Sequence, residues 1–239
     1  ANTNTRGADR NELVRKHLVA VASIASESSS SAVNARRKTI EGEGAYELGE
    51  RRQAVEILEA IAATESVGSE DGARALDRLG EIYIALQDPE SVERVTTKLV
   101  RRFSDDRRSA RRAIDRWVSW IAQSPQVDPM ADLERLARAY FDLPMIAARA
   151  AFAKAELLAA HGSTQAAIDA WRLIADGFPN DRTLASNALL SVGNAAARLG
   201  QAPLSIASFE RVIAQFADDV SLRRQAQSGI TGIALTTAR

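Results

Sequence analysis

Residues 189–219 read LLSVGNAAARLGQAPLSIASFERVIAQFADD, a stretch that predicts two antiparallel helices joined by a tight turn. Apolar residues from Leu189 to Leu199 recur at steps of three and four, which places them on one face of a first helix. Gly200 breaks this spacing as a C-terminal cap would. Pro203 then stands where a second helix would begin, a position that tolerates proline.

The second helix has its own apolar face, formed by Ile206, Phe209, Val212, Ile213 and Phe216. Neither helix can hide its apolar stripe alone, so such pairs have to stack on neighbouring pairs. Gly193 lies on the apolar face of the first helix, although a glycine there costs about 1 kcal/mol relative to alanine. We therefore expect another helix to pass close to Gly193 and, by the same reasoning, close to Gly80.

The stretch ends in FADD (216–219), and nearly the same letters stand at FPND (178–181) and FSDD (103–106). Phe216 follows Phe178 by 38 residues, and Phe178 follows Phe103 by 75, close to two such steps. A fourth mark is expected near residue 141, where the sequence has FDLP (141–144). Periods of about 20 to 50 residues are typical of helical arrays, so we interpret each mark as the end of one repeat.

The sequence therefore predicts an all-α fold, an α-solenoid of stacked antiparallel helix pairs. The predicted repeats are 35–68, 73–106, 110–144, 148–181 and 186–219, followed by a C-terminal capping helix at 221–239. The repeat at 110–144 departs most from the others, because Pro125 and Pro129 lengthen the connection between its helices. We expect residues 1–10 to be a flexible tail and residues 11–34 to be an N-terminal helix with a serine-rich connection.

Composition limits the classes of function. The chain has 239 residues, of which 46% are hydrophobic, so it can bury a sizeable core as two compact domains or one array. Its 31 basic and 31 acidic residues balance, which gives no net field to attract nucleic acid or an anionic membrane. It has no cysteine, which excludes disulfides and thiolate metal sites. No apolar run approaches the roughly 20 residues of a membrane span.

The repeat resembles the tetratricopeptide repeat (TPR). That family's pattern of Leu-Gly and Tyr in the first helix, then Ala, an aromatic residue and Pro in the second, appears at Leu79, Gly80 and Tyr83 and at Ala167, Trp171 and Pro179. The resemblance implies a right-handed solenoid. The longer units ending in Phe-Pro are similar to those of bacterial envelope proteins, such as outer-membrane assembly lipoproteins and Tol-Pal accessory proteins. This favours a bacterial periplasm or envelope location, with the cytoplasm as the alternative.

The resemblance also implies that the first helices line a groove that binds a protein or peptide. Carried over by alignment, the groove residues are Arg74, Asp77, Glu81, Arg149, Phe152, Glu156, Asn187, Leu190, Asn194 and Arg198. Asn194 and Arg198 are four residues apart on one helix face, so together they are able to hold a peptide carboxylate or backbone. The alternative is that these are solvated surface groups.

Residues 101–112 form a dense basic patch, whose members are Arg101, Arg102, Arg107, Arg108, Arg111 and Arg112. Such a patch is able to receive phosphate, RNA or an acidic partner. Arginines at the end of one helix and aspartates at the start of the next also suit the helix dipoles, and we favour this structural reading. Aromatic residues that would stack on bases are scarce here.

No catalytic motif is present: the sequence has no GxxxxGK[ST], no GxSxG and no HExxH. The acid pairs in the repeat loops are better explained as turn formers and helix caps. His17 and His161 lack partners at metal-ligand spacing, so no metal or cofactor is expected. The aromatic residues of the divergent repeat, Trp117, Trp120, Tyr140 and Phe141, are expected to pack in the core rather than around a ligand.

These observations predict a non-enzymatic scaffold for protein–protein interaction that binds through its groove. One alternative is a permanent structural subunit of a larger assembly, including one at a membrane. A further alternative is a nucleic-acid-binding helical repeat, which the neutral charge balance disfavours.

Overall fold

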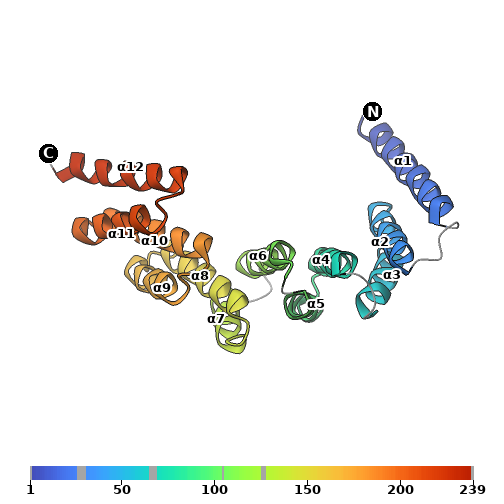
Figure 1. The fold of residues 1–239 in the computed structure, drawn as a ribbon, viewed down its shortest axis with the longest axis horizontal. Coiled ribbons are helices and arrows are strands. Elements are labelled where there is room, and N and C mark those ends of the chain that lie inside the picture. Colours follow the sequence, from blue (N-terminus) through green and yellow to red (C-terminus); the bar gives the residue numbers. More distant parts are fainter. Residues whose placement is uncertain (1, 26–30, 65–68, 104, 125–127, 238–239) are drawn as a thin grey trace. The chain divides into compact units, whose positions relative to one another are not determined.

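The computed structural model describes residues 2–25, 31–64, 69–103, 105–124 and 128–237 (Figure 1). Within these ranges every regular element is a helix, and none is a strand. Consecutive helices pack against one another from α1 to α5 and again from α7 to α12. The prediction of an all-α chain built from consecutive helix pairs is therefore confirmed.

The helices group into two compact units, Ala1–Trp117 and Val118–Arg239. The first unit contains α1 (Asn2–Ala25), α2 (Ser31–Glu47), α3 (Arg51–Ala63), α4 (Ser69–Ala85), α5 (Pro89–Arg102) and the first part of α6 (Arg107–Gln123). The second unit contains the rest of α6, then α7 (Pro129–Ala139), α8 (Pro144–Ala160), α9 (Thr164–Gly177), α10 (Arg182–Arg198), α11 (Ala202–Gln215) and α12 (Val220–Thr237).

The division falls within the predicted repeat 110–144, the one that departs most from the others in sequence. Five residues separate α6 from α7, whereas three separate α8 from α9 and α10 from α11. Helix α7 is also the shortest of the twelve, with 11 residues. Pro129 is the first residue of α7, while Pro125 lies outside the described residues.

The N-terminal segment is helical, whereas the sequence predicts a flexible tail there. Helix α1 begins at Asn2, so it covers most of the stretch 1–10 that the sequence predicts as a flexible tail. No proline stands in α1, and the one glycine in it, Gly7, costs only about 1 kcal/mol in a helix. Most of the serine cluster lies outside the described residues, and α2 begins at its last member, Ser31.

Four helix pairs share one three-residue turn. In each, the middle residue has a positive φ, with values of 84° at Gly49, 58° at Gln87, 83° at Gly162 and 72° at Gly200. The N–H of the next residue donates back across the turn, as from Gln201 to the Ala196 carbonyl at 2.9 Å. This is a Schellman-type helix end, which normally selects glycine at the left-handed position.

One detail of the predicted apolar faces is wrong: the residue just before the left-handed position is exposed. Leu199, predicted on the apolar face of its helix, occupies this place and is 45% exposed, and the equivalent Leu86 is 46% exposed. Their N–H groups still donate to the carbonyls of Ile82 and Ala195, but the left-handed residue that follows ends the helix, so both side chains lie at an exposed helix end.

The marks FSDD, FPND and FADD each combine a helix end with a helix start. The N–H groups of Phe103, Phe178 and Phe216 each donate to the carbonyl four residues earlier. The Asp three residues later is the N-cap of the next helix: the Asp181 carboxylate accepts from the Leu184 N–H at 3.0 Å, and Asp106 and Asp219 act in the same way. The interpretation of these acids as turn and cap residues is confirmed at these positions.

The fourth mark begins one residue earlier than the FDLP register predicts. Tyr140 takes the place of the Phe, because its N–H donates to the Leu136 carbonyl at 3.1 Å and its carbonyl accepts from Leu143. Phe141 is 83% exposed, so its expected place in the core is wrong. Trp117, in contrast, is 1% exposed, as expected of a core residue.

Gly193 is in close contact with its partner helix. A Cβ placed there would lie 2.6 Å from the ring of Phe209, and one placed at Gly229 of α12 would lie 2.5 Å from the same ring. The ring is thus held between two helices by two glycines. A Cβ at Gly80 would meet nothing closer than 3.7 Å, so the expected close approach at Gly80 is wrong. The residue of α5 that corresponds to Phe209 is Thr96, which is smaller.

We predict opposite effects of adding a methyl group at these two glycines. Gly193→Ala should lower the free energy of unfolding by about 1–3 kcal/mol, because Gly229 blocks the retreat of Phe209. Gly80→Ala should raise it by up to about 1 kcal/mol through helix propensity alone. Denaturant unfolding followed by circular dichroism measures both. Gly177→Ala, at an open position of the same unit, is the control for Gly193→Ala, and equal stability of these two variants would contradict the close contact.

A second pair of variants tests the shared turn. Gln87→Gly should stabilise the protein by up to about 1 kcal/mol, because it removes the strain of a side chain in the left-handed region. Gly200→Ala should destabilise it by about 1 kcal/mol for the converse reason. Thermal unfolding of the two proteins should therefore shift in opposite directions from wild type. A shift of both in the same direction would show that the turn does not select its middle residue by φ.

Candidate functional site

The first helices of the repeats carry two grooves, one in each unit. The N-terminal groove is a cavity of about 330 Å³, lined by Glu43, Arg74, Asp77, Arg78, Glu81, Arg112 and Arg116. These residues come from α2, α4 and the part of α6 that belongs to the first unit. Helices α2, α4 and α6 have 17 residues each, so their positions can be compared one by one.

Ion pairs link the three helices of the N-terminal groove. Arg74 holds Glu43 with two hydrogen bonds of 2.7 Å, from Nε and Nη2, and this pairing raises the pKa of the Arg74 guanidinium. Arg116 Nη2 lies 3.0 Å from Glu81 Oε1, while Arg78 pairs with the other oxygen of Glu81. Two-point pairing of an arginine with a carboxylate fixes the geometry of both side chains.

Asp77 lies at the centre of this network. The residue is only 9% exposed, and its carboxylate lies 2.9 Å from Arg112 Nη2 and 3.0 Å from Arg116 Nη1. Arg116 Nη1 also donates to the Asp77 main-chain carbonyl at 2.9 Å. Every charged side chain that lines the N-terminal groove is therefore already matched by a charge of the chain itself.

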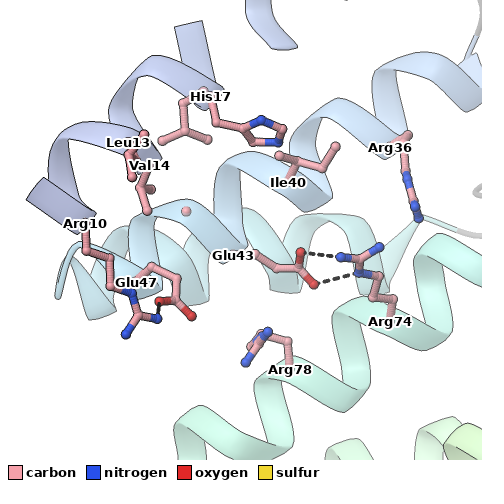
Figure 2. A pocket seen from close by; sticks show the side chains of 12 residues that line it. Arg10, Leu13, Val14, His17, Arg36, Ile40, Glu43, Glu47, Arg74 and Arg78 are labelled. Atoms are coloured by element: carbon pink, nitrogen blue, oxygen red, sulfur yellow. Dashed lines mark hydrogen bonds and ion pairs between the residues drawn. The ribbon is translucent and has the colours of Figure 1, made fainter. Parts of the chain in front are cut away.

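A second pocket, of about 460 Å³, adjoins this groove (Figure 2). Figure 2 shows Leu13, Val14 and His17 of α1 on one side and Ile40 of α2 opposite them. The Glu43–Arg74 pair borders the pocket, and Arg10 of α1 pairs with Glu47 of α2. His17, which the sequence gives no role, thus lines a pocket together with apolar side chains.

The C-terminal groove is a cavity of about 580 Å³ between α10 and α12. It is lined by Leu190, Asn194, Phe209, Arg224, Gln225, Ser228 and Gly229. Phe209, which is 2% exposed, lies beneath it and is packed against Gly229. Helices α10 and α12 are in contact, as are α8 and α10, so the first helices of this unit also lie side by side.

The polar groups of the C-terminal groove differ from those of the N-terminal groove. Asn194, Arg224 and Gln225 are exposed, and their side chains make no hydrogen bond or ion pair among the residues that the structure describes. The same holds for Asn187 and Arg198 on α10, which are exposed but do not line the cavity. These side chains are free to bind another molecule.

The predicted residues of α8 lie beside this groove rather than in it. Phe152 packs near Trp171 of α9, with 6.4 Å between the ring centroids. Glu156 is exposed, yet partial loss of water raises its pKa, and the nearby charge of Arg149 offsets only part of that rise. Phe152 is therefore a packing residue at least in part, while Glu156 remains at the surface.

The structure thus divides the ten predicted groove residues. Arg74, Asp77 and Glu81 line one cavity, and Leu190 and Asn194 line the other. The N-terminal groove also contains Glu43 and Arg116, which were not among the predicted residues, and Arg112, which was predicted only as part of the basic patch; alignment of α2 and α6 with α4 indicates all three. The C-terminal groove also contains Arg224, Gln225 and Ser228 of α12, a helix predicted only as a cap.

The arginines of the basic patch, residues 101–112, have different partners and do not form one site. Arg102 donates to the main-chain carbonyls of Ala62 and Thr64, at 2.8 and 2.7 Å, and so caps the end of α3. Arg111 lies 3.7 Å from Asp115, and Arg112 faces Asp77 in the N-terminal groove. Arg107 and Arg108 are exposed in the first turn of α6. These contacts favour the structural reading of the patch.

The described residues contain no group of three or more His, Cys, Asp or Glu side chains arranged to hold a metal ion. No described helix combines the length and apolar character needed to cross a membrane.

Comparison with known proteins gives a loose similarity of fold. No protein family and no curated protein matches the sequence. Among solved structures, the chain is similar to the nearly identical TPR-like repeats of a protein described as a kinesin light chain from Podospora anserina. The sequences are 17% identical over 90% of this chain and 89% of the other, with a TM-score of 0.37. This similarity is too loose to indicate a function, which has to be argued from the residues of this chain.

We predict that the N-terminal groove depends on Asp77. Asp77→Asn should lower the free energy of unfolding by about 1–2 kcal/mol, because it leaves Arg112 and Arg116 close together without their shared counter-charge. Denaturant unfolding at low salt measures the loss, and added salt should reduce it by screening the two arginines. Glu210→Gln, an exposed position on α11, is the matched control. A loss no larger than that of the control would contradict the central place of Asp77.

Proposed function

We propose that this chain is a non-enzymatic interaction protein, a TPR-like helical repeat that binds a segment of a partner protein in the C-terminal groove. The observation that carries the proposal is the set of polar side chains, Asn194, Arg224 and Gln225, that have no partner among the described residues and lie beside the apolar side chain of Leu190. A few polar groups that fix orientation above apolar contacts are typical of a binding site.

The contrast between the two grooves supports this choice. In the N-terminal groove the arginines and carboxylates already bind one another, so a partner would have to break these pairs before binding. In the C-terminal groove no such pair has to be broken, and the polar groups lose only water when a partner binds. The free energy of association is more favourable where fewer existing contacts are lost.

The packing beneath the C-terminal groove also supports binding. Phe209 is fixed between Gly193 and Gly229, and Ser205 donates to the buried Gly193 carbonyl at 2.6 Å. The two helices that carry the polar groups are therefore held before a partner arrives. Such pre-organisation reduces the ordering entropy that binding costs.

Two finer proposals rest on the sequence alone. One is a bacterial envelope location, which depends on the Phe-Pro ending of the longer repeats. The other is permanent membership of a larger assembly, for which the native mass of the protein is the test. Both are separate from the binding proposal, because a groove of this kind serves either a transient or a permanent partner.

Selection from a random peptide library displayed on phage tests the proposed function. Wild-type protein should enrich peptides with a shared motif, and a synthetic peptide carrying that motif should bind in solution. The double variant Asn194→Ala with Arg224→Ala should weaken this binding about tenfold or more, because it removes two polar contacts. Circular dichroism should show unchanged helicity.

The control for this selection is Arg172→Ala. Arg172 is exposed on α9 and does not line the C-terminal groove, so its removal changes the charge without changing the site. Failure of wild type to enrich any motif, or equal binding by the double variant, would overturn the assignment of this groove.

A further inference from the structure

The two helices that form the C-terminal groove carry only positive charge. Together α10 and α12 contain four arginines, Arg182, Arg198, Arg223 and Arg224, and no Asp or Glu. Arg182 pairs with Asp218 at 2.7 Å, whereas Arg198 and Arg224 are exposed and make no ion pair among the described residues. Unmatched cations beside a groove favour an anionic partner and speed its approach.

The amide side chains add a second requirement. Asn194 of α10 and Gln225 of α12 both line the groove, and each carries one acceptor and a donor group. The main chain of an extended peptide presents the same two groups at every residue. Two amides on different helices therefore suit an extended main chain that lies between them.

The spacing along α10 fits such a chain. Arg198 follows Asn194 by four residues, about 6 Å along the helix axis. In an extended chain, side chains on alternate residues point the same way and lie about 7 Å apart. Arg224 lines the cavity and Arg198 lies outside it, so two different carboxylates of an extended chain suit the two arginines better than one.

We infer that the C-terminal groove binds an extended acidic segment within a partner protein, with Asp or Glu on alternate residues. Arg224 and Arg198 pair with successive carboxylates, and Asn194 and Gln225 bond the intervening main chain. This inference rests on the proposed function of the groove. A single-stranded nucleic acid fits less well, because the only aromatic ring lining the cavity, Phe209, is 2% exposed and offers no stacking surface.

Fluorescence anisotropy with the full chain tests the inference. The probe is a labelled 12-residue peptide of alternating Glu and Ser with an amidated C-terminus, and the comparison peptide has Gln in place of Glu. The acidic peptide should bind, and its affinity should fall as salt increases. The Gln peptide should bind at least tenfold more weakly, because it lacks the charges.

Protein variants place the binding in the groove. Arg224→Ala and Arg198→Ala should each weaken binding of the acidic peptide about tenfold, while Arg172→Ala, with the same change of charge, should leave it unchanged. Arg224→Glu should abolish binding of the acidic peptide and improve binding of an alternating Lys–Ser peptide. Circular dichroism confirms that each variant remains helical.

Three outcomes would overturn the inference. One is equal affinity for the Glu and Gln peptides. Another is binding that needs a free C-terminal carboxylate, which would make the groove a site for chain ends. The third is tighter binding of a 12-residue oligothymidylate, which would make it a nucleic-acid site.

The two proposals fail in different ways. If library selection returns a neutral motif that depends on Asn194, the groove binds a partner and only the acidic chemistry is wrong. If selection returns no motif and the acidic peptide does not bind, the groove itself is wrong.

Discussion

One close contact holds the first helix against the second in two of the helix pairs. In α2 and in α10 the twelfth residue is a glycine, and it meets the eighth residue of the helix that follows. A Cβ at Gly42 would lie 2.8 Å from Leu58, and one at Gly193 would lie 2.6 Å from Phe209. Because the small residue brings the two axes together, its neighbours on the first helix keep a fixed orientation. That face carries the groove residues.

The twelfth position is different in α6. In α6 the twelfth residue is Val118, which is 6% exposed and cannot allow the same approach. Helix α6 is also followed by the longer connection and by the shortest helix, α7. The boundary between the compact units, Trp117 to Val118, falls at this position. A bulky side chain at the twelfth position and a longer connection thus coincide with the boundary between the two compact units.

Helix positions and turns could be predicted from the sequence because they depend on local signals. Gly200 and Gly162 have the φ that a cap glycine requires, but Gln87 fills the same place with a side chain, and only the backbone reveals it. Helix spacing cannot show on its own that Leu199 lies beyond the end of its helix, because the cap decides this. Gly80 shows a further limit of prediction from the sequence, because a glycine indicates close approach of two helices only where the facing residue is large. The charge network around Asp77 joins helices up to 39 residues apart in sequence, so no local pattern contains it.

The difference between the grooves follows from how the charges are distributed over equivalent positions. Glu43, Glu81 and Asn194 occupy the same place on α2, α4 and α10, the thirteenth residue of each helix. At Glu43 and Glu81 an arginine of the same or the next first helix pairs with the carboxylate, so the face becomes neutral within itself, whereas Glu156 at this place on α8 has no ion pair among the described residues. Where it holds an amide, the arginines nearby have no such partner. The chain is neutral as a whole, with 31 charges of each sign, yet one groove retains an uncompensated positive charge. The net charge of the chain therefore says little about what such a repeat protein binds, because a few positions on the first helices determine the charge of each groove.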